Sequence, residues 1–139
     1  MKKNTLLELQ KLGARIEVSG DDVVAVRFVG PRLNDDALVA LTACTRLKRL
    51  ELIDTRVSDK GAIVIASLKS LESLEFEGTR ITDQGMASFR RLAKLHHVAC
   101  SRLVTDAAFK ALPSWPLLRS IRLRDSRVTD LGLREMRGL

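Results

Sequence analysis

Residues 47–61 read LKRLELIDTRVSDKG, and residues 71–85 repeat the same plan as LESLEFEGTRITDQG. The leucines, the Thr-Arg pair, the aspartate and the final glycine fall on matching positions 24 residues apart. Further copies begin at Val23, Leu95 and Leu118, so five copies follow one another at spacings of 24, 24, 24 and 23 residues. A repeat of this length predicts a solenoid, because one copy cannot bury its own apolar face and becomes stable only against its neighbours.

Each copy predicts a strand, a turn and a helix in that order. Leu50 and Leu52 alternate with polar residues, which indicates a short strand with one side facing inward. The pair that follows, such as Ser58-Asp59, suits a helix start. Its oxygens can accept hydrogen bonds from free N–H groups, and its carboxylate favours the positive end of the helix dipole. Since the order never changes, the five strands must lie parallel.

The helix of each copy is expected to bury apolar residues three positions apart, after a small residue such as Gly61 that lets neighbouring helices approach closely. The expected buried positions are Leu38, Leu41, Cys44, Ala62, Ile65, Leu68, Met86, Phe89, Leu92, Phe109, Leu112, Trp115, Leu133, Met136 and Leu139. Trp115 is expected to face the core, and the alternative is an exposed anchor on the helix side.

The copies resemble a leucine-rich repeat of the bacterial Leu-x-x-Leu-x-Leu-x-x-Thr-x-Val-Thr-Asp-x-Gly-Leu type, related to the cysteine-containing class. The resemblance covers about residues 23–139. It implies an α/β fold, a right-handed superhelix of about five strand–turn–helix coils with a parallel sheet on its concave side. It also implies a role in protein–protein interaction, and it supplies no catalytic residues. The fourth copy departs from the pattern, since it lacks one residue before Val104 and has Ala108 in place of glycine.

Residues 1–22 are expected to cap the N-terminal end of a single domain whose repeats span residues 23–139. The pattern predicts a helix over residues 4–13 that begins with a capping box at Thr5 and Glu8 and stops at Gly13. Residues 15–18 alternate as a strand and are followed by a turn. We expect this strand to form an antiparallel hairpin with residues 23–28 and to cover the edge of the sheet.

The C-terminal end has no such cover in the sequence pattern. Solenoids commonly end in an atypical capping repeat. Three alternatives are therefore open for strand 121–123 and the last helix: they pack against a partner or a second copy, the chain is a fragment of a longer protein, or the polar residues Arg134, Glu135 and Arg137 suffice.

The composition limits the classes of function. The net charge is +7, from 24 Lys and Arg against 17 Asp and Glu, and aromatic residues make up 4% of the chain. So few aromatics disfavour a stacking platform for single-stranded nucleic acid. The chain has no apolar run long enough for a transmembrane helix and no secretory core after its basic start, so a soluble cytoplasmic protein is expected.

The chemistry-bearing residues do not form a catalytic or metal-binding pattern. Cys44 and Cys100 stand where other copies have Leu, Val or Phe, which predicts reduced core thiols. His97 and Glu75 are too few ligands for a metal site, and no serine or cysteine has a histidine base at a suitable spacing. We therefore expect no catalytic residues, no metal, no cofactor and no enzyme activity.

Outward-facing strand residues are the first candidate binding surface. They sort by charge along the stack, with acids in the centre and bases towards the C-terminal end. Glu75 and Glu77 repel each other unless a cation meets them, either Arg49 or Arg122 internally or a partner protein. The surface is either a solvated charged face or a face that orients a partner. Its candidate residues are Arg27, Arg49, Glu51, Glu72, Glu75, Glu77, His97, Arg119, Arg122 and Arg124.

The second candidate surface consists of arginines that occupy equivalent turn positions in successive repeats. In a stack they would form a row along the rim, one strand spacing of about 4.8 Å apart. Such a row suits nucleic acid or another polyanion, which is the alternative partner class. Each arginine could equally pair with a nearby aspartate, such as Asp54, Asp59, Asp83 or Asp130. The row consists of Arg32, Arg56, Arg80, Arg127 and, close by, Arg102.

Overall fold

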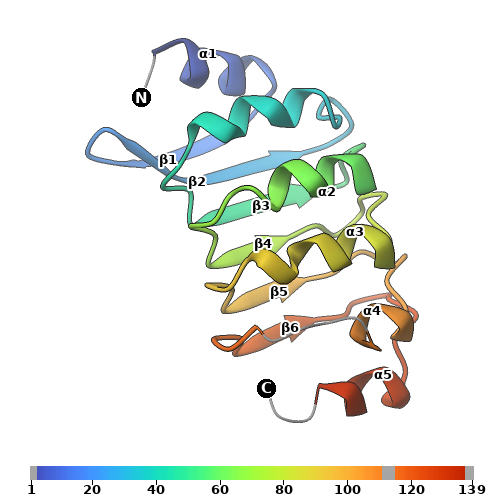
Figure 1. Ribbon diagram of the computed structural model, residues 1–139. Helices are drawn as coiled ribbons and strands as arrows, with labels where there is room; N and C mark the ends of the chain where they lie inside the picture. Colours follow the sequence, from blue (N-terminus) through green and yellow to red (C-terminus); the bar gives the residue numbers. More distant parts are fainter. Residues whose placement is uncertain (1–2, 111–114, 137–139) are drawn as a thin grey trace.

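The repeat folds as a stack of strand–turn–helix coils in the computed structural model, which describes residues 3–110 and 115–136 (Figure 1). The strands are β1 (Arg15–Ser19), β2 (Asp22–Val29), β3 (Arg49–Ile53), β4 (Ser73–Glu75), β5 (His97–Ala99) and β6 (Ser120–Arg122). The α-helices are α1 (Lys3–Lys11), α2 (Asp59–Ile65), α3 (Asp83–Ser88), α4 (Asp106–Lys110) and α5 (Asp130–Glu135). Two 3-10 helices complete the list, η1 (Ala37–Ala43) and η2 (Phe89–Arg91).

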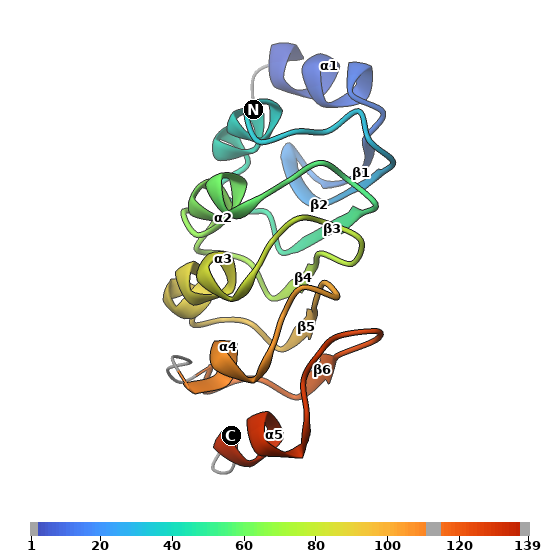
Figure 2. The same cartoon turned by 90° about the vertical axis from the view of Figure 1, so that its right-hand side faces the viewer.

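The sheet follows the chain order, β1-β2-β3-β4-β5-β6, and strands β2 to β6 are parallel. All the coil helices lie on one side of this sheet (Figures 1 and 2). The predicted α/β fold of alternating strand–helix units with a mostly parallel sheet is therefore confirmed, whereas the right-handed superhelix stays a prediction from the resemblance. We call the side of β2 to β6 on which no described helix lies the open sheet face.

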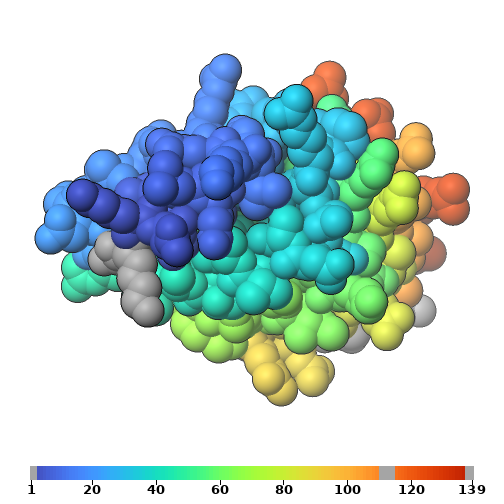
Figure 3. Space-filling view, turned by 90° about the horizontal axis from the view of Figure 1, so that it is seen from above, coloured from blue at the N-terminus to red at the C-terminus, as the bar shows by residue number. Residues whose placement is uncertain are grey.

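The N-terminal segment covers the first coil, as the view from that end shows (Figure 3). Strand β1 pairs antiparallel with β2, and Leu9 of α1 is fully buried. Gly13 ends the helix with a φ of 85°, in the left-handed region that suits glycine. The predicted capping box is wrong, because α1 already includes Lys3 and Thr5 is buried inside the helix rather than before it.

The core is a continuous column of apolar side chains between sheet and helices. The inward pairs of the middle strands, such as Leu50/Leu52 and Leu74/Phe76, are fully buried. Trp115 is also buried and donates its indole N–H to the Phe89 carbonyl at 3.0 Å, so the exposed-anchor alternative is wrong.

Two expectations about the helices need correction. The first helical segment, η1, is a 3-10 helix, although Leu38 and Leu41 are buried as expected. Leu133 is 43% exposed instead of buried, because the described residues place no further coil against α5. The expected core positions Leu112 and Leu139 lie outside the described residues.

Aspartate carboxylates that accept hydrogen bonds from the following coil tie successive coils together. Thr82 donates its backbone N–H and its hydroxyl to the two carboxylate oxygens of Asp59 at 2.7 and 2.6 Å. The same link joins Asp35 to Ser58, Asp83 to Thr105 and Asp106 to Thr129. We call this series the aspartate ladder.

The aspartate ladder refines two sequence expectations. The Ser or Thr hydroxyl of each pair does accept from its own helix, as Ser58 Oγ does from the Lys60 N–H at 3.3 Å. The aspartate, however, serves the following coil rather than its own helix start. A side chain at Gly61 would come within 2.5 Å of the Asp35 carboxylate, so the small residue there makes room for this link as well as for the neighbouring helix.

The turn after each strand explains why the fourth copy is one residue shorter. Gly30, Asp54, Gly78 and Asp125 all occupy the same turn position, and all have a positive φ. The fourth copy lacks this residue. Instead, Ser101 is buried there and donates its hydroxyl to the Ile81 carbonyl of the preceding coil at 2.6 Å, and its own carbonyl accepts the Val104 N–H within the turn at 3.3 Å.

Candidate binding surface

The parallel register brings the outward strand residues into columns on the open sheet face. One column runs Ala25, Arg49, Ser73, His97, Ser120, and the next runs Arg27, Glu51, Glu75, Ala99, Arg122. Both columns have the register that the repeat alignment predicts, but Ala25 and Ala99 within them are buried. The third expected column is interrupted, because Ser101 is buried instead of facing outward.

The acids in the centre of this face are met by cations of the same chain. Glu75 lies 3.4 Å from His97 Nε2 and 3.8 Å from an Arg122 nitrogen, and the same arginine lies 3.8 Å from Glu77. Arg122 therefore performs the internal neutralisation that the sequence suggested.

Two other arginines of the face form ion pairs with acids other than Glu75 and Glu77. Arg27 lies 3.3 Å from Glu51, and Arg49 pairs at 2.6 Å with Glu17 of β1 rather than with the central acids. These ion pairs are partly exposed to solvent, where each contributes only about 0.2–1 kcal/mol.

Three candidate residues lie away from the centre of the face. Glu72 precedes β4 and pairs with Lys48 at 3.3 Å, at the end of the strands where the chain enters the sheet. Arg119 is exposed just before β6. Arg124 follows β6 and belongs to the groove described below. The structure thus spreads the predicted set along the whole length of the strands rather than over one compact site.

The five rim arginines, Arg32, Arg56, Arg80, Arg102 and Arg127, are all exposed. Within residues 3–110 and 115–136, no ion pair to a carboxylate within 4.0 Å involves any of them. The alternative in which they pair with nearby aspartates is therefore not found there. Asp59 and Asp83 have another role, because their carboxylates accept the hydrogen bonds of the aspartate ladder.

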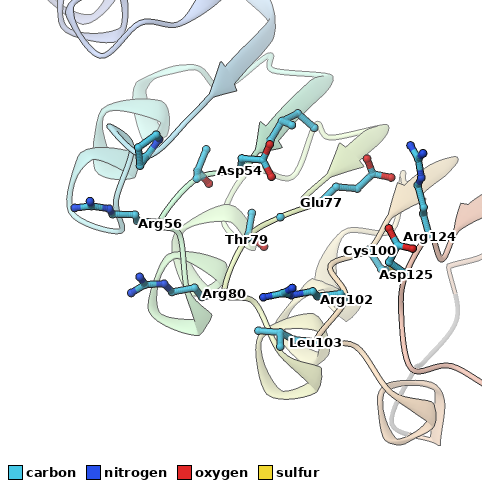
Figure 4. A pocket seen from close by; sticks show the side chains of 14 residues that line it. Asp54, Arg56, Glu77, Thr79, Arg80, Cys100, Arg102, Leu103, Arg124 and Asp125 are labelled. Carbon is cyan, nitrogen blue, oxygen red and sulfur yellow. The ribbon is translucent and has the colours of Figure 1, made fainter.

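A groove of about 770 Å³ gathers three of these arginines (Figure 4). Arg56, Arg80 and Arg102 extend along one side of it, and the acids Asp54, Glu77 and Asp125 lie towards the other, with Arg124 beside the last two. We call this site the rim groove. Arg32 and Arg127 do not line it.

Sequence reasoning missed one residue of the rim groove, Thr55, whose buried Oγ1 has no hydrogen-bond partner in the described structure. Glu77, which was expected on the open sheet face, also lines the groove, and its buried Oε1 likewise has no hydrogen bond there. Thr79 occupies the same repeat position as Thr55, yet its hydroxyl donates to the Phe76 carbonyl at 2.8 Å. The repeat pattern holds no signal that separates these two threonines.

The cysteines are poorly suited to nucleophilic catalysis. Both thiols are free and buried. Burial raises the pKa of Cys44, and burial together with the charges of Asp83 and Glu77 raises the pKa of Cys100 to about 12. A thiol with a raised pKa stays protonated and is a weak nucleophile at neutral pH. Among the described residues, no group of three or more His, Cys, Asp or Glu side chains could hold a metal ion.

Comparison with known proteins finds one family. A family model described as Leucine Rich repeat matches residues 67–89, which span the end of one coil and the strand, turn and helix of the next. This match indicates a protein-binding repeat module of a family that is typically non-catalytic. No curated protein matches the chain. In the part of the chain that the structure describes, no helix is long and apolar enough to cross a membrane.

Proposed function

We propose that the protein is a non-catalytic protein–protein interaction module that binds a partner protein through the open sheet face. The observation that carries this proposal is the register of β2 to β6, which aligns charged side chains from successive coils on a face that no described helix covers (Figure 2). Repeats of this kind build extended binding surfaces from positions that lie outside the core.

The charges of the face suit orientation of a partner more than tight binding. Its acids lie in the centre, on β3 and β4, and are flanked by Arg27 on β2 and Arg122 on β6, which pair with Glu51 and Glu75 respectively. Because the pairs are partly exposed, a partner with complementary charges can replace them at little energetic cost. Charge complementarity of this kind raises the association rate and fixes the register of a complex.

Site-specific photo-crosslinking tests the proposal. A benzoylphenylalanine at Ser73, in the middle of the face, is expected to crosslink the partner in extracts of the native cell. The matched control carries the same group at Ile63, which is exposed on α2 on the other side of the molecule. Partner crosslinks from Ile63 alone would place the binding surface on the helices and refute the open sheet face.

Binding of nucleic acid or another polyanion through the rim arginines is the second candidate function. The exposed arginines without ion pairs and the net charge of +7 favour it. Phosphate binding releases counterions, so it weakens steeply as salt increases. Weak retention on an immobilised DNA or RNA column at low salt would eliminate this candidate.

A homodimer through the last coil is also proposed. Leu131 and Leu133 of α5 are exposed, and Ile121 and Leu123 are only partly buried, whereas their counterparts Leu74 and Phe76 are fully covered. A second copy that packs here would bury this apolar surface. The double substitution Leu131→Glu, Leu133→Glu should then convert a dimer to a monomer in sedimentation velocity. A wild-type protein that sediments as a monomer refutes the dimer.

The remaining features of the proposal are a cytoplasmic location and the absence of a metal or a cofactor. The two unpaired buried thiols agree with a reducing compartment. The scattered histidine, cysteine and acidic side chains of the described residues agree with a protein that binds without catalysis.

A further inference from the structure

We propose that the rim groove binds an extended peptide segment of the partner in which acidic and basic residues alternate. This inference rests on the proposed protein-binding function and adds the chemistry of the segment that the groove recognises. It follows from the two opposite columns of charge in the groove and from two features of the described residues: the three arginines have no carboxylate partner, and Asp54 and Asp125 have no cation partner.

The basic column consists of Arg56, Arg80 and Arg102. Their guanidinium groups extend along one side of the groove (Figure 4), and none has a carboxylate within 4.0 Å among the described residues. Backbone hydrogen bonds hold successive turns in register, since the Arg56 N–H donates to the Leu33 carbonyl and the Arg80 N–H donates to the Val57 carbonyl. Arg56 and Arg80 therefore stand about one strand spacing apart and can hold carboxylates of one ligand together, with Arg102 further along the same side of the groove.

The acidic column consists of Asp54, Glu77 and Asp125. Asp54 precedes Arg56 by two residues and Glu77 precedes Arg80 by three, so the stacking of these two coils places both acids on one side of both arginines. The carboxylates of Asp54 and Asp125 have no hydrogen bond or ion pair in the part of the chain that the structure describes. Glu77 lies 3.8 Å from an Arg122 nitrogen, and Arg124 lies beside Glu77 and Asp125 without an ion pair to either among the described residues (Figure 4).

Two polar atoms in the groove are buried without a hydrogen bond in the described structure, Thr55 Oγ1 and Glu77 Oε1. The Thr55 hydroxyl can donate or accept, whereas the Glu77 oxygen can only accept and so favours a ligand that donates hydrogen bonds. A buried polar atom without a hydrogen bond is unfavourable. A peptide supplies backbone N–H groups, and lysine or arginine side chains supply further donors. A phosphodiester backbone supplies acceptors only.

An alternating peptide matches this geometry because side chains of an extended chain point to opposite edges in turn. Its acids would meet the arginine side of the groove while its basic residues meet the acidic side. A continuous polyanion meets the arginines but is repelled by three carboxylates in the same groove. The mixed lining therefore favours a peptide over nucleic acid.

The rim groove is continuous with the open sheet face. Ile53 ends β3, Glu77 follows β4 and Arg124 follows β6, and all three line the groove. A partner that lies on the sheet can therefore extend a segment into the groove without leaving the surface.

Fluorescence anisotropy with labelled octapeptides tests the inference at low ionic strength, where charge screening is weakest. One peptide alternates glutamate and lysine. A second has the same composition in blocks of two, and a third probe is an oligothymidylate of equal length. We expect the alternating peptide to bind most tightly. The double substitution Arg56→Gln, Arg80→Gln should weaken its binding about fivefold, because two exposed ion pairs are lost.

The matched control is Arg90→Gln, Arg91→Gln, which removes the same charge from exposed positions on η2. It should leave binding unchanged, and circular dichroism should show all variants folded. Equal binding of the two peptides, no binding of either, equal loss in the control, or tighter binding of oligothymidylate would overturn the inference. The crosslinks from position 73 test the open sheet face separately. They can therefore be observed even if the peptide does not bind the rim groove.

Discussion

Gly78 combines two constraints on one backbone position. Its φ is +69°, which side chains other than that of glycine rarely adopt, and a Cβ there would overlap the Asp54 carboxylate. Asp54 itself has a φ of 55° at the equivalent position one coil earlier. The turn thus tolerates an aspartate in one coil and needs glycine in the next, because the side chain of the first occupies the space beside the second.

Alanine at Gly78 should therefore destabilise the protein by about 1–3 kcal/mol, through the left-handed backbone and the overlap with Asp54. Urea unfolding measures the change. Gly30→Ala is the matched control, since Gly30 has a φ of +93° but no atom within 4 Å of an added Cβ. Gly30→Ala should lower the free energy of unfolding only through the left-handed backbone conformation, because its side chain meets no neighbour. Equal losses for the two variants would contradict the role of Asp54.

Cys100 gives a pH dependence with a definite sign. Its pKa is about 12 in the folded protein, against a usual value of 9.0. Above pH 9 the unfolded chain loses the thiol proton while the folded chain retains it, so the unfolded state binds fewer protons and stability falls as pH rises. We expect a loss that approaches about 1.4 kcal/mol per pH unit above pH 9.

Urea unfolding at pH 7.5 and pH 10 checks this dependence against the variant Cys100→Ala, which lacks the titrating group. The variant is less stable overall because it loses buried volume, but its stability should fall less between the two pH values. A parallel fall in both proteins would show that the thiol does not titrate differently in the two states.

At the level of the elements, the aspartate ladder is expected to contribute to stability at each junction between coils. The Asp59 carboxylate accepts two hydrogen bonds from Thr82, and hydrogen bonds to a charged group contribute about 1.5–3 kcal/mol. Asp59→Ala should therefore lower the free energy of unfolding by about 2 kcal/mol. Asp36→Ala, which removes an exposed acid without a side-chain cap bond, should change it little.

A double-mutant cycle of Asp59→Ala with Thr82→Val isolates the link itself. If the two side chains act through each other, the double variant loses about 1 kcal/mol less than the two single variants together. Additive losses would mean that Asp59 stabilises its own helix start, as the sequence pattern first suggested, and not the next coil.

The elements show which features the sequence could predict. Strand positions and the columns of the open sheet face followed from the repeat, because parallel strands in a regular stack leave no freedom of register. The hydrogen-bond partners of the aspartates could not be predicted. Each aspartate can reach both its own helix start and the next coil, and the sequence does not show which of the two it bonds. The capping box at Thr5 failed for a related reason: its residue types occur inside helices as well as before them.

At the level of the whole molecule, the rim groove is the feature that the sequence could not predict. It depends on turns in which Asp54 and Asp125 take left-handed conformations, and on a shorter fourth turn that Ser101 links to the preceding coil. The repeat pattern predicted the row of arginines, but it did not predict which of them line the rim groove. The structure brings together Arg56, Arg80 and Arg102 and leaves Arg32 and Arg127 outside the groove.

A stack in which coils contact mainly their neighbours should be most stable in its middle. Leu74 of β4 is fully buried between two neighbouring strands, whereas Ile121 of β6 is only partly buried. Leu74→Ala should therefore cost about 2–5 kcal/mol, and Ile121→Ala less than half of that. Amide hydrogen exchange should show the same order, with the slowest exchange in β3 to β5 and faster exchange in β6 and α5. Uniform protection of all strands, or equal losses of stability for the two variants, would mean that the last coil is covered in solution. Repeating the exchange measurement at several protein concentrations would then show whether a second copy of the chain covers it.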